Sequence, residues 1–233
     1  MPNIITIDEL RSLLQQFKGS KCWNVYSCGS AHSLRLSFGR AVEIQVYSMR
    51  DQISKIRYHG QYEMFVLCTW RLDLPDRPIC SAMCDYDVIK QTASCLMGDT
   101  FESIEIFPPF WEATVHFLSG KKLRIFCDNI DEDNEESLDN WLCCDKEFIY
   151  NVGCGSRISK MERFNRVSDE LYDPEQIDRR FVISDLNFCK NDSEGVRYCP
   201  CPPNVREAKD DATESEIDMK SQNDPVETDV NRE

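Results

Sequence analysis

Apolar residues recur at two different spacings along this chain, and the change of spacing predicts where helix gives way to strand. Over residues 6–17 they stand three and four positions apart, which indicates a short amphipathic helix. Over residues 33–38 and again over 42–47, apolar and polar residues alternate, as in strands with one buried face. The pair Gly39-Arg40 between these runs is typical of a tight turn, so we expect a hairpin.

The same order returns in the second half of the chain. Residues 86–97 predict a second helix, and residues 113–117 and 123–127 alternate on either side of a turn signal at 119–122. Four pairs of similar positions stand 79 residues apart: Gly19 and Gly98, Val25 and Ile104, Leu36 and Val115, and Phe38 and Phe117. This shared offset predicts an internal duplication. Each half then closes on a tryptophan, Trp70 and Trp141, although that offset falls to 71.

Together these elements predict an α+β fold of mainly antiparallel strands, because the connections within each hairpin are too short for parallel crossovers. Residues 1–158 should form one duplicated domain, with pseudo-repeats at about 5–75 and 86–158 that each hold a short helix and a strand hairpin. Residues 159–205 show only weak patterning. Residues 206–233 have no aromatic residue and little else to bury, so we expect a disordered acidic tail there.

Negative charge is concentrated in two stretches of the chain. The formal net charge is −14, of which residues 128–147 carry −8 and residues 206–233 carry −6, so the remainder sums to zero. Binding of nucleic acid depends on cationic neutralisation of phosphates, and we therefore expect no direct nucleic-acid partner. Most of the surface should be ordinary, with one strongly negative loop.

The N-terminus has no basic region followed by an apolar one, and no segment has the roughly 18 consecutive apolar residues of a membrane span. These features favour a soluble cytoplasmic protein with no membrane association. The 13 cysteines follow no pairing pattern and several lie in apolar runs, so we expect reduced thiols.

The residues that could carry chemistry form no recognisable catalytic or metal-binding motif. Of the three histidines, His32, His59 and His116, neither His32 nor His116 is followed by a Cys, Ser or acidic residue at a spacing that identifies a triad. A zinc site at Cys189, Cys199 and Cys201 would lack a fourth ligand, and the acidic run at 131–136 does not fit the EF-hand spacing. We therefore predict no catalytic residue, no cofactor and no metal.

Two groups of residues are candidates for binding. The acidic run is either a solvated loop or a docking site for a basic protein, and its members are Asp131, Glu132, Asp133, Glu135 and Glu136. The second candidate is a pocket for a small anionic ligand at the junction of the two halves, formed by Trp70, Arg71 and Trp141. An arginine beside a tryptophan either lies at a sheet end or presents a planar donor to an anion.

Three short strings resemble those of a known class of domains: Leu-Cys-Thr-Trp-Arg-Leu at 67–72, Leu-Arg-Ile-Phe-Cys-Asp at 123–128 and Asp-Asn-Trp-Leu at 139–142. Together with the order of helix, glycine and hairpin, they resemble small uncharacterised bacterial domains of the immunity-protein-like kind over about residues 5–158. The resemblance implies a cytoplasmic bacterial protein, such as one that neutralises a toxin or serves in a defence locus. It implies no catalytic residues.

These observations leave three hypotheses about function. The leading one is a non-catalytic binding protein that engages a basic partner, such as a toxin or nuclease, through the acidic run. The second is a cysteine-based enzyme or thiol sensor, in which one thiol has a depressed pKa. The third is the small-ligand module at the repeat junction.

Overall fold

The secondary structure follows from a computed structural model, which describes residues 3–28, 33–48, 53–128, 139–153, 157–163, 167–178 and 182. The elements are β1 (Asn3–Ile4), α1 (Ile7–Gln16), β2 (Cys22–Cys28), β3 (Ser33–Ser48), β4 (Ile53–Val66), β5 (Thr69–Asp73), β6 (Pro78–Ser81), α2 (Tyr86–Ala93), η1 (Ser94–Leu96), β7 (Phe101–Phe107), β8 (Glu112–Phe117), β9 (Lys122–Phe126), β10 (Trp141–Cys144), β11 (Phe148–Val152), β12 (Ile158–Glu162), β13 (Val167–Tyr172) and η3 (Pro174–Gln176). Every ladder between these strands is antiparallel, which confirms the predicted α+β class with mainly antiparallel strands.

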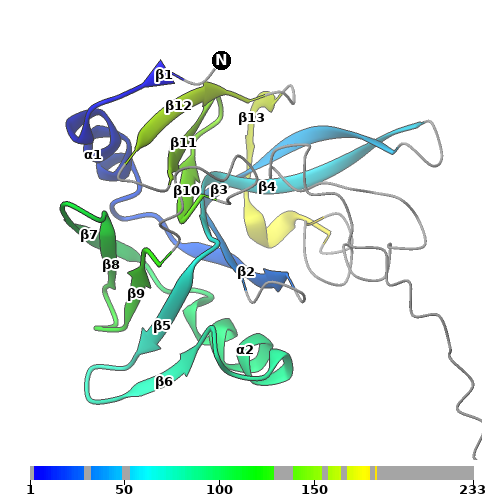
Figure 1. Cartoon of the computed structure of the whole chain (residues 1–233). Coiled ribbons are helices and arrows are strands. Elements are labelled where there is room, and N and C mark those ends of the chain that lie inside the picture. The colour runs from blue at the N-terminus through cyan, green and yellow to red at the C-terminus, as the bar shows by residue number, and fades with distance from the viewer. Residues whose placement is uncertain are drawn as a thin grey trace, which may run out of the picture.

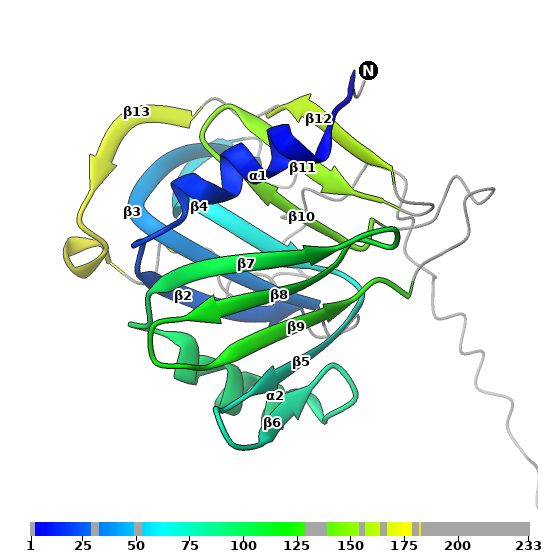
Figure 2. The same cartoon turned by 90° about the vertical axis from the view of Figure 1, so that its left-hand side faces the viewer.

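The strands form two sheets, and each sheet contains strands from both halves of the chain (Figure 1). The larger sheet has the order β1-β12-β11-β10-β4-β3-β13, with β2 also paired to β3. The smaller sheet has the order β6-β5-β9-β8-β7, so that β5 and β6 of the first half lie beside three strands of the second (Figure 2). The chain changes sheet after β4 and again after β9. Neither half therefore contains a complete sheet of its own.

The ladder between β7 and β8 repeats the ladder between β2 and β3 at a displacement of 79 positions. Cys22 pairs with Phe38 as Phe101 pairs with Phe117, and the remaining five pairs match in the same way. Both ladders also contain a register shift directly after that first pair. Because the bulge interrupts both ladders at the same step, the two hairpins share local geometry as well as hydrophobic pattern.

Backbone hydrogen bonds between the two halves also come in matched pairs. Gly19 N donates to Phe101 O over 2.9 Å, and Gly98 N donates to Cys22 O over 2.7 Å. The two bonds are equivalent under the 79-residue offset, because Gly98 stands 79 positions after Gly19 and Phe101 stands 79 positions after Cys22. Between them lies the isolated bridge of Lys21 with Thr100, which are themselves 79 positions apart. This reciprocal pattern is that of an isologous interface, here formed within one chain.

The two tryptophans occupy matching positions in opposite sheets. Trp70 on β5 pairs with Ile125 on β9, and Trp141 on β10 pairs with Val66 on β4. Trp70 therefore lies beside a strand of the second half, and Trp141 lies beside a strand of the first half. Both side chains are fully buried, with 0% of their surface exposed.

One large apolar core joins the inner faces of both sheets and both helices. Phe38 of β3 contacts Phe17 and Phe101, with ring centroids 5.7 Å apart in each pair. Helix α1 reaches this core because it begins at a capping box, in which Glu9 N donates to Thr6 Oγ1 and Thr6 N donates to the Glu9 carboxylate. The predicted helix over residues 6–17 is thus confirmed, as is the predicted hairpin of β8 and β9.

The predicted turn at Gly39-Arg40 is wrong. Strand β3 continues through these residues to Ser48, and its register against β4 shifts between Phe38 and Ala41. Gly39 has a φ of +75°, which suits a β-bulge as well as a turn. A bulge leaves the alternation on either side intact, so the pattern alone could not separate it from a hairpin. The hairpin partner of β3 is β4.

The segment after residue 158 extends the larger sheet. Strand β12 pairs with β11 and β1, and β13 pairs with β3. Val182 forms a parallel bridge with Tyr58. The acidic tail predicted at 206–233 lies outside the described residues. In the described part of the chain, no helix combines the length and apolar character needed to cross a membrane.

Candidate functional site

A cluster of charged side chains is buried on the face of the larger sheet that points away from the main core. Leu34 and Leu36 on β3 point into that core, so the alternating Arg35 points to the opposite face. Glu63 on the neighbouring strand β4 lies on the same face. The side chains of Glu63 and Arg35 are 0% and 3% exposed, and burial of this kind requires charge pairing.

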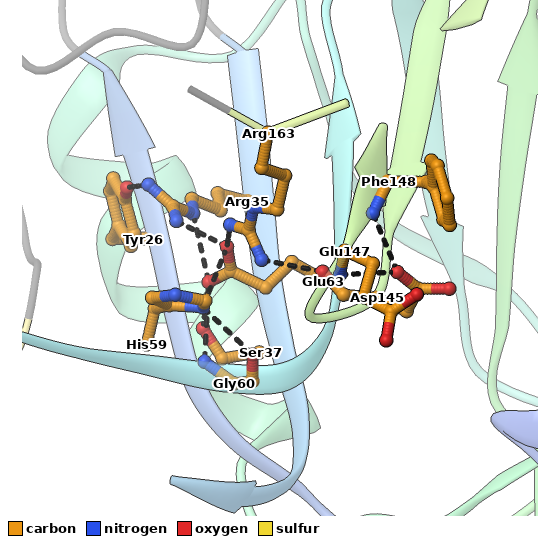
Figure 3. Close-up of polar contacts among 10 residues, drawn as sticks. All are labelled: Tyr26, Arg35, Ser37, His59, Gly60, Glu63, Asp145, Glu147, Phe148 and Arg163. Atoms are coloured by element: carbon orange, nitrogen blue, oxygen red, sulfur yellow. Dashed lines mark hydrogen bonds and ion pairs between the residues drawn. The ribbon is translucent and has the colours of Figure 1, made fainter. Parts of the chain in front are cut away.

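Glu63 is the centre of the cluster (Figure 3). Arg35 binds both of its carboxylate oxygens, with 3.2 Å between Arg35 Nε and Glu63 Oε1. Arg163, which follows β12, places Nη2 3.4 Å from Glu63 Oε2. Ser37 Oγ and Gly60 N also donate to Oε1, over 3.1 Å and 3.3 Å. The carboxylate thus joins two strands and the segment after β12 through charged hydrogen bonds.

The arginines are themselves held by further contacts. Arg35 Nη1 donates to the Tyr26 hydroxyl, and its guanidinium lies 4.0 Å from the centre of the Phe65 ring. Arg163 Nη1 donates to Asp145 O over 2.6 Å. A planar guanidinium suits this position because its fork can bind a carboxylate while its face stacks on an aromatic ring.

Gly60 permits the close approach of strands at this point. A Cβ built there would lie 2.5 Å from Tyr62 O and 2.7 Å from Phe38 N. Both neighbours are backbone atoms, which cannot move without disturbing the sheet. The glycine therefore belongs to the bulge geometry that brings Ser37 and Glu63 together.

His59 completes the cluster as a neutral side chain. Its Nδ1 lies 2.8 Å from Gly60 O and 3.4 Å from Glu63 Oε2, while its Nε2 has no hydrogen-bond partner among the described residues. Burial lowers the pKa of His59 to about 3, although Glu63 acts in the opposite direction. The imidazole is therefore uncharged at neutral pH.

The cluster is poorly suited to proton transfer. Burial alone would raise the pKa of Glu63, but Arg35, His59 and Arg163 together hold it at about 2. A carboxylate with so low a pKa is a weak general base, and no part of Glu63 is exposed to a substrate. We therefore interpret the cluster as a structural ion-pair network.

Sequence reasoning missed Arg35 and Glu63. Polar residues that alternate with apolar ones are expected on the solvent face of a strand, and nothing local distinguishes a covered face from an open one. A usable signal was the spacing of His59 and Glu63 around Gly60 in a strand-like run.

The structure separates Arg71 from the two tryptophans with which it was predicted to bind a small ligand. Trp70 and Trp141 belong to the main core and are 0% exposed. The Arg71 side chain is 42% exposed and lies on the opposite face of β5 from Trp70, since neighbouring side chains in a strand alternate. Its fork is occupied by Asp73, with 2.8 Å from Nε to Oδ1 and 3.1 Å from Nη2 to Oδ2.

The described cysteines include one with a lowered pKa. Burial raises the pKa of Cys80 and of Cys144 to about 11, and it also raises that of Cys22, Cys95 and Cys143. A hydrogen bond with Cys127, together with burial, raises the pKa of Cys68. By contrast, a hydrogen bond from the Ser81 backbone lowers the pKa of the half-buried Cys84. In the described ranges, no three His, Cys, Asp or Glu residues are placed to hold a metal ion.

The five predicted partner-binding residues, 131–136 without Asn134, lie outside the described residues. The chain is described up to Asp128 and again from Asp139, and on each side one residue is hydrogen-bonded to the same carbonyl group. Cys127 Sγ donates to Trp111 O over 3.3 Å, and Trp141 Nε1 donates to Trp111 O over 3.1 Å. The Asp128 carboxylate in turn accepts a hydrogen bond from Thr69 N over 3.2 Å.

Comparison of the chain with family models, curated proteins and solved structures finds no match.

Proposed function

We propose that this chain is a non-catalytic, immunity-type binding protein that engages a basic protein through an acidic crossover. The crossover comprises residues 127–140, and its partner-binding residues are Asp131, Glu132, Asp133, Glu135 and Glu136. A basic toxin or nuclease is the class of partner, and the cytoplasm of a bacterium is the proposed setting. One observation carries the proposal: the two connections through which the chain passes from one sheet to the other differ greatly in length.

The first change of sheet uses two residues, Leu67 and Cys68, between the end of β4 and the start of β5. The second, from β9 to β10, uses residues 127–140. The first connects β4 to β5, which pairs with β9, and the second connects β9 to β10, which pairs with β4. Two residues are therefore enough for this connection, and the second crossover is twelve residues longer.

We also propose that the two halves arose by duplication, which makes the comparison of the two crossovers meaningful. The matched ladders at a displacement of 79 support this, as do the reciprocal hydrogen bonds around Lys21 and Thr100. The exchanged positions of Trp70 and Trp141 support it further. On this view, the acidic crossover is a feature that one copy has and the other lacks.

The charge of the long crossover suits a basic partner. Residues 127–140 hold seven acidic residues and no basic residue, a net charge of −7, whereas the chain outside residues 128–147 and 206–233 sums to zero. A concentrated field of one sign accelerates encounter with a partner of the opposite sign, and salt screens it.

The test uses a basic protein that co-purifies with the untagged chain from its native cell, identified by mass spectrometry. Its association rate is measured by surface plasmon resonance between about 20 mM and about 500 mM salt, and we expect a fall of about tenfold or more. Changing all five acidic residues to their amides should abolish this salt dependence. An association rate that neither salt nor these changes affect would overturn the proposal.

A matched control lies in the same chain. Amide substitution of Asp210, Asp211, Glu214, Glu216 and Asp218 removes the same five charges from the C-terminal stretch. This variant should retain the salt dependence of the wild-type protein. If both variants lose it equally, total charge rather than the crossover determines the association.

Thiol chemistry at Cys84 is the second candidate function, because Cys84 has a lowered pKa and is not fully buried. Cys95 is the matched comparison, since it is exposed but has a raised pKa. Brief alkylation at neutral pH followed by mass spectrometry should label Cys84 well before Cys95 if the candidate holds. Equal slow labelling of both would remove it. The third hypothesis, a small anionic ligand at Trp70, Arg71 and Trp141, gains no support from the geometry described above.

A further inference from the structure

The turn between β7 and β8 presents two aromatic side chains to solvent. Phe107 is 48% exposed and Phe110 is 63% exposed, and both flank the exposed pair Pro108 and Pro109. Four consecutive apolar residues at a turn are unusual in a soluble chain, because turns are normally polar. An exposed apolar patch of this kind is typical of an interaction site.

Hydrogen bonds from buried side chains hold the turn in place. Trp111 has a φ of +59°, which a bulky residue rarely adopts without compensation. Its carbonyl accepts hydrogen bonds from Trp141 Nε1 and Cys127 Sγ, and those two side chains are 0% and 9% exposed. Backbone conformations of this kind persist where the surrounding structure enforces them, and they concentrate at functional positions. A turn fixed in this way loses little conformational entropy when a partner binds.

The same carbonyl connects this turn to the acidic crossover. Cys127 is the first residue of the crossover, and Trp141 directly follows it as the first residue of β10. The side chains of both residues donate hydrogen bonds to the Trp111 carbonyl. The turn and the end of β9 lie at the same end of the smaller sheet (Figure 2). Exposed Glu112 and Asp128 add described carboxylates at this end. Apolar and acidic groups are thus brought together from separate parts of the chain.

We propose that Phe107 and Phe110 are the apolar anchor of a docking surface for a basic protein partner. The contact segment of that partner sets apolar side chains among lysines and arginines. Aromatic side chains at the centre of an interface supply most of its affinity, and a charged rim supplies orientation and speed. This inference rests on the proposed function, because it takes the charge of the partner from the acidic crossover.

The experiment pans a display library of random 12-residue peptides against the full-length protein and measures the affinity of the enriched peptides. We expect peptides that combine lysine or arginine with large apolar residues. The double variant Phe107→Ser and Phe110→Ser should weaken them by at least about tenfold, as truncation of interface anchors does. The variant Leu118→Ser is the control, because Leu118 is 65% exposed and follows β8 at the opposite end of the sheet.

The outcomes separate this inference from the proposed function. Enriched peptides that are basic but bind the double variant as well as the wild type would overturn the aromatic anchor and leave the acidic crossover as the binding site. Enriched peptides without basic residues would overturn both proposals. An equal loss with Leu118→Ser would show that general surface hydrophobicity, and not this turn, drives the binding. Unchanged thermal midpoints of both variants would exclude unfolding as the cause of a loss.

Discussion

Each sheet carries a buried acidic residue between two arginines on its outer face, but only in the larger sheet are the arginines buried as well. In the larger sheet, Glu63 lies between Arg35 and Arg163, whose side chains are 3% and 7% exposed. In the smaller sheet, Asp73 lies between Arg71 and Arg124, whose side chains are each 42% exposed. Each triad pairs one carboxylate with two guanidinium groups, and the burial of the arginines is the clearest difference between them.

Burial of the arginines changes how much such a triad contributes to the stability of the protein. Exposed arginines keep their hydration and lose little when their carboxylate is removed. Buried arginines have exchanged water for the carboxylate, and removal leaves them uncompensated in an apolar environment. The pKa of both acidic groups is held below its usual value by the arginines, against burial that would raise it. The buried triad should therefore dominate the stability of the protein although its contact distances are similar.

The largest expected effect is the loss of the buried carboxylate. Changing Glu63→Ala should lower the free energy of unfolding by about 3–5 kcal/mol, because two buried arginines lose their partner. The matched change Asp73→Ala should cost about 1 kcal/mol. Urea denaturation at pH 7 measures both. Equal losses from the two variants would show that cover does not distinguish the triads.

Acid should act on the buried cluster through His59. Its pKa is lowered in the folded state to about 3 from 6.5, so between these values the unfolded chain binds a proton that the folded chain does not. Stability should therefore fall as pH falls below 6.5, by at most about 1.4 kcal/mol per pH unit from this group. Glu63, with a folded pKa of about 2, adds a further loss only below about 4.5.

Unfolding experiments between pH 7 and pH 5 test the contribution of His59. The variant His59→Gln should flatten the dependence, since glutamine does not titrate. A slope that survives in His59→Gln would assign the acid sensitivity to another group.

Salt provides the smallest expected effect. The cost of Asp73→Ala should fall below about 0.5 kcal/mol in 1 M salt, because the Debye length there is about 3 Å and both arginines are exposed. The cost of Glu63→Ala should persist, since salt does not reach a carboxylate that is 0% exposed. Repeating the urea experiment in 1 M sodium chloride compares the two. A similar response of both variants to salt would contradict the difference in solvent access.

The sequence by itself determined the elements whose signals are local. Thr6 and Glu9 form a capping box that depends only on neighbouring residues, and the turn at Ser119 and Gly120 separates two strands with the expected alternation. The offset of 79 positions was also visible, because equivalent positions need similar residues. These features require no knowledge of which segments meet in space.

Only the tertiary structure decided what depends on distant partners. Gly39 is a bulge and not a turn because β4 lies beside β3 over its full length, and that pairing is not encoded in residues 33–47 alone. The exchange of Trp70 and Trp141 between sheets, and the burial of Arg35 with Glu63, follow from contacts between segments far apart in the chain. The alternation of apolar and polar residues along a strand indicates that its two faces have different surroundings. It does not record which strand pairs beside it or what covers the second face, and those two facts define the buried cluster.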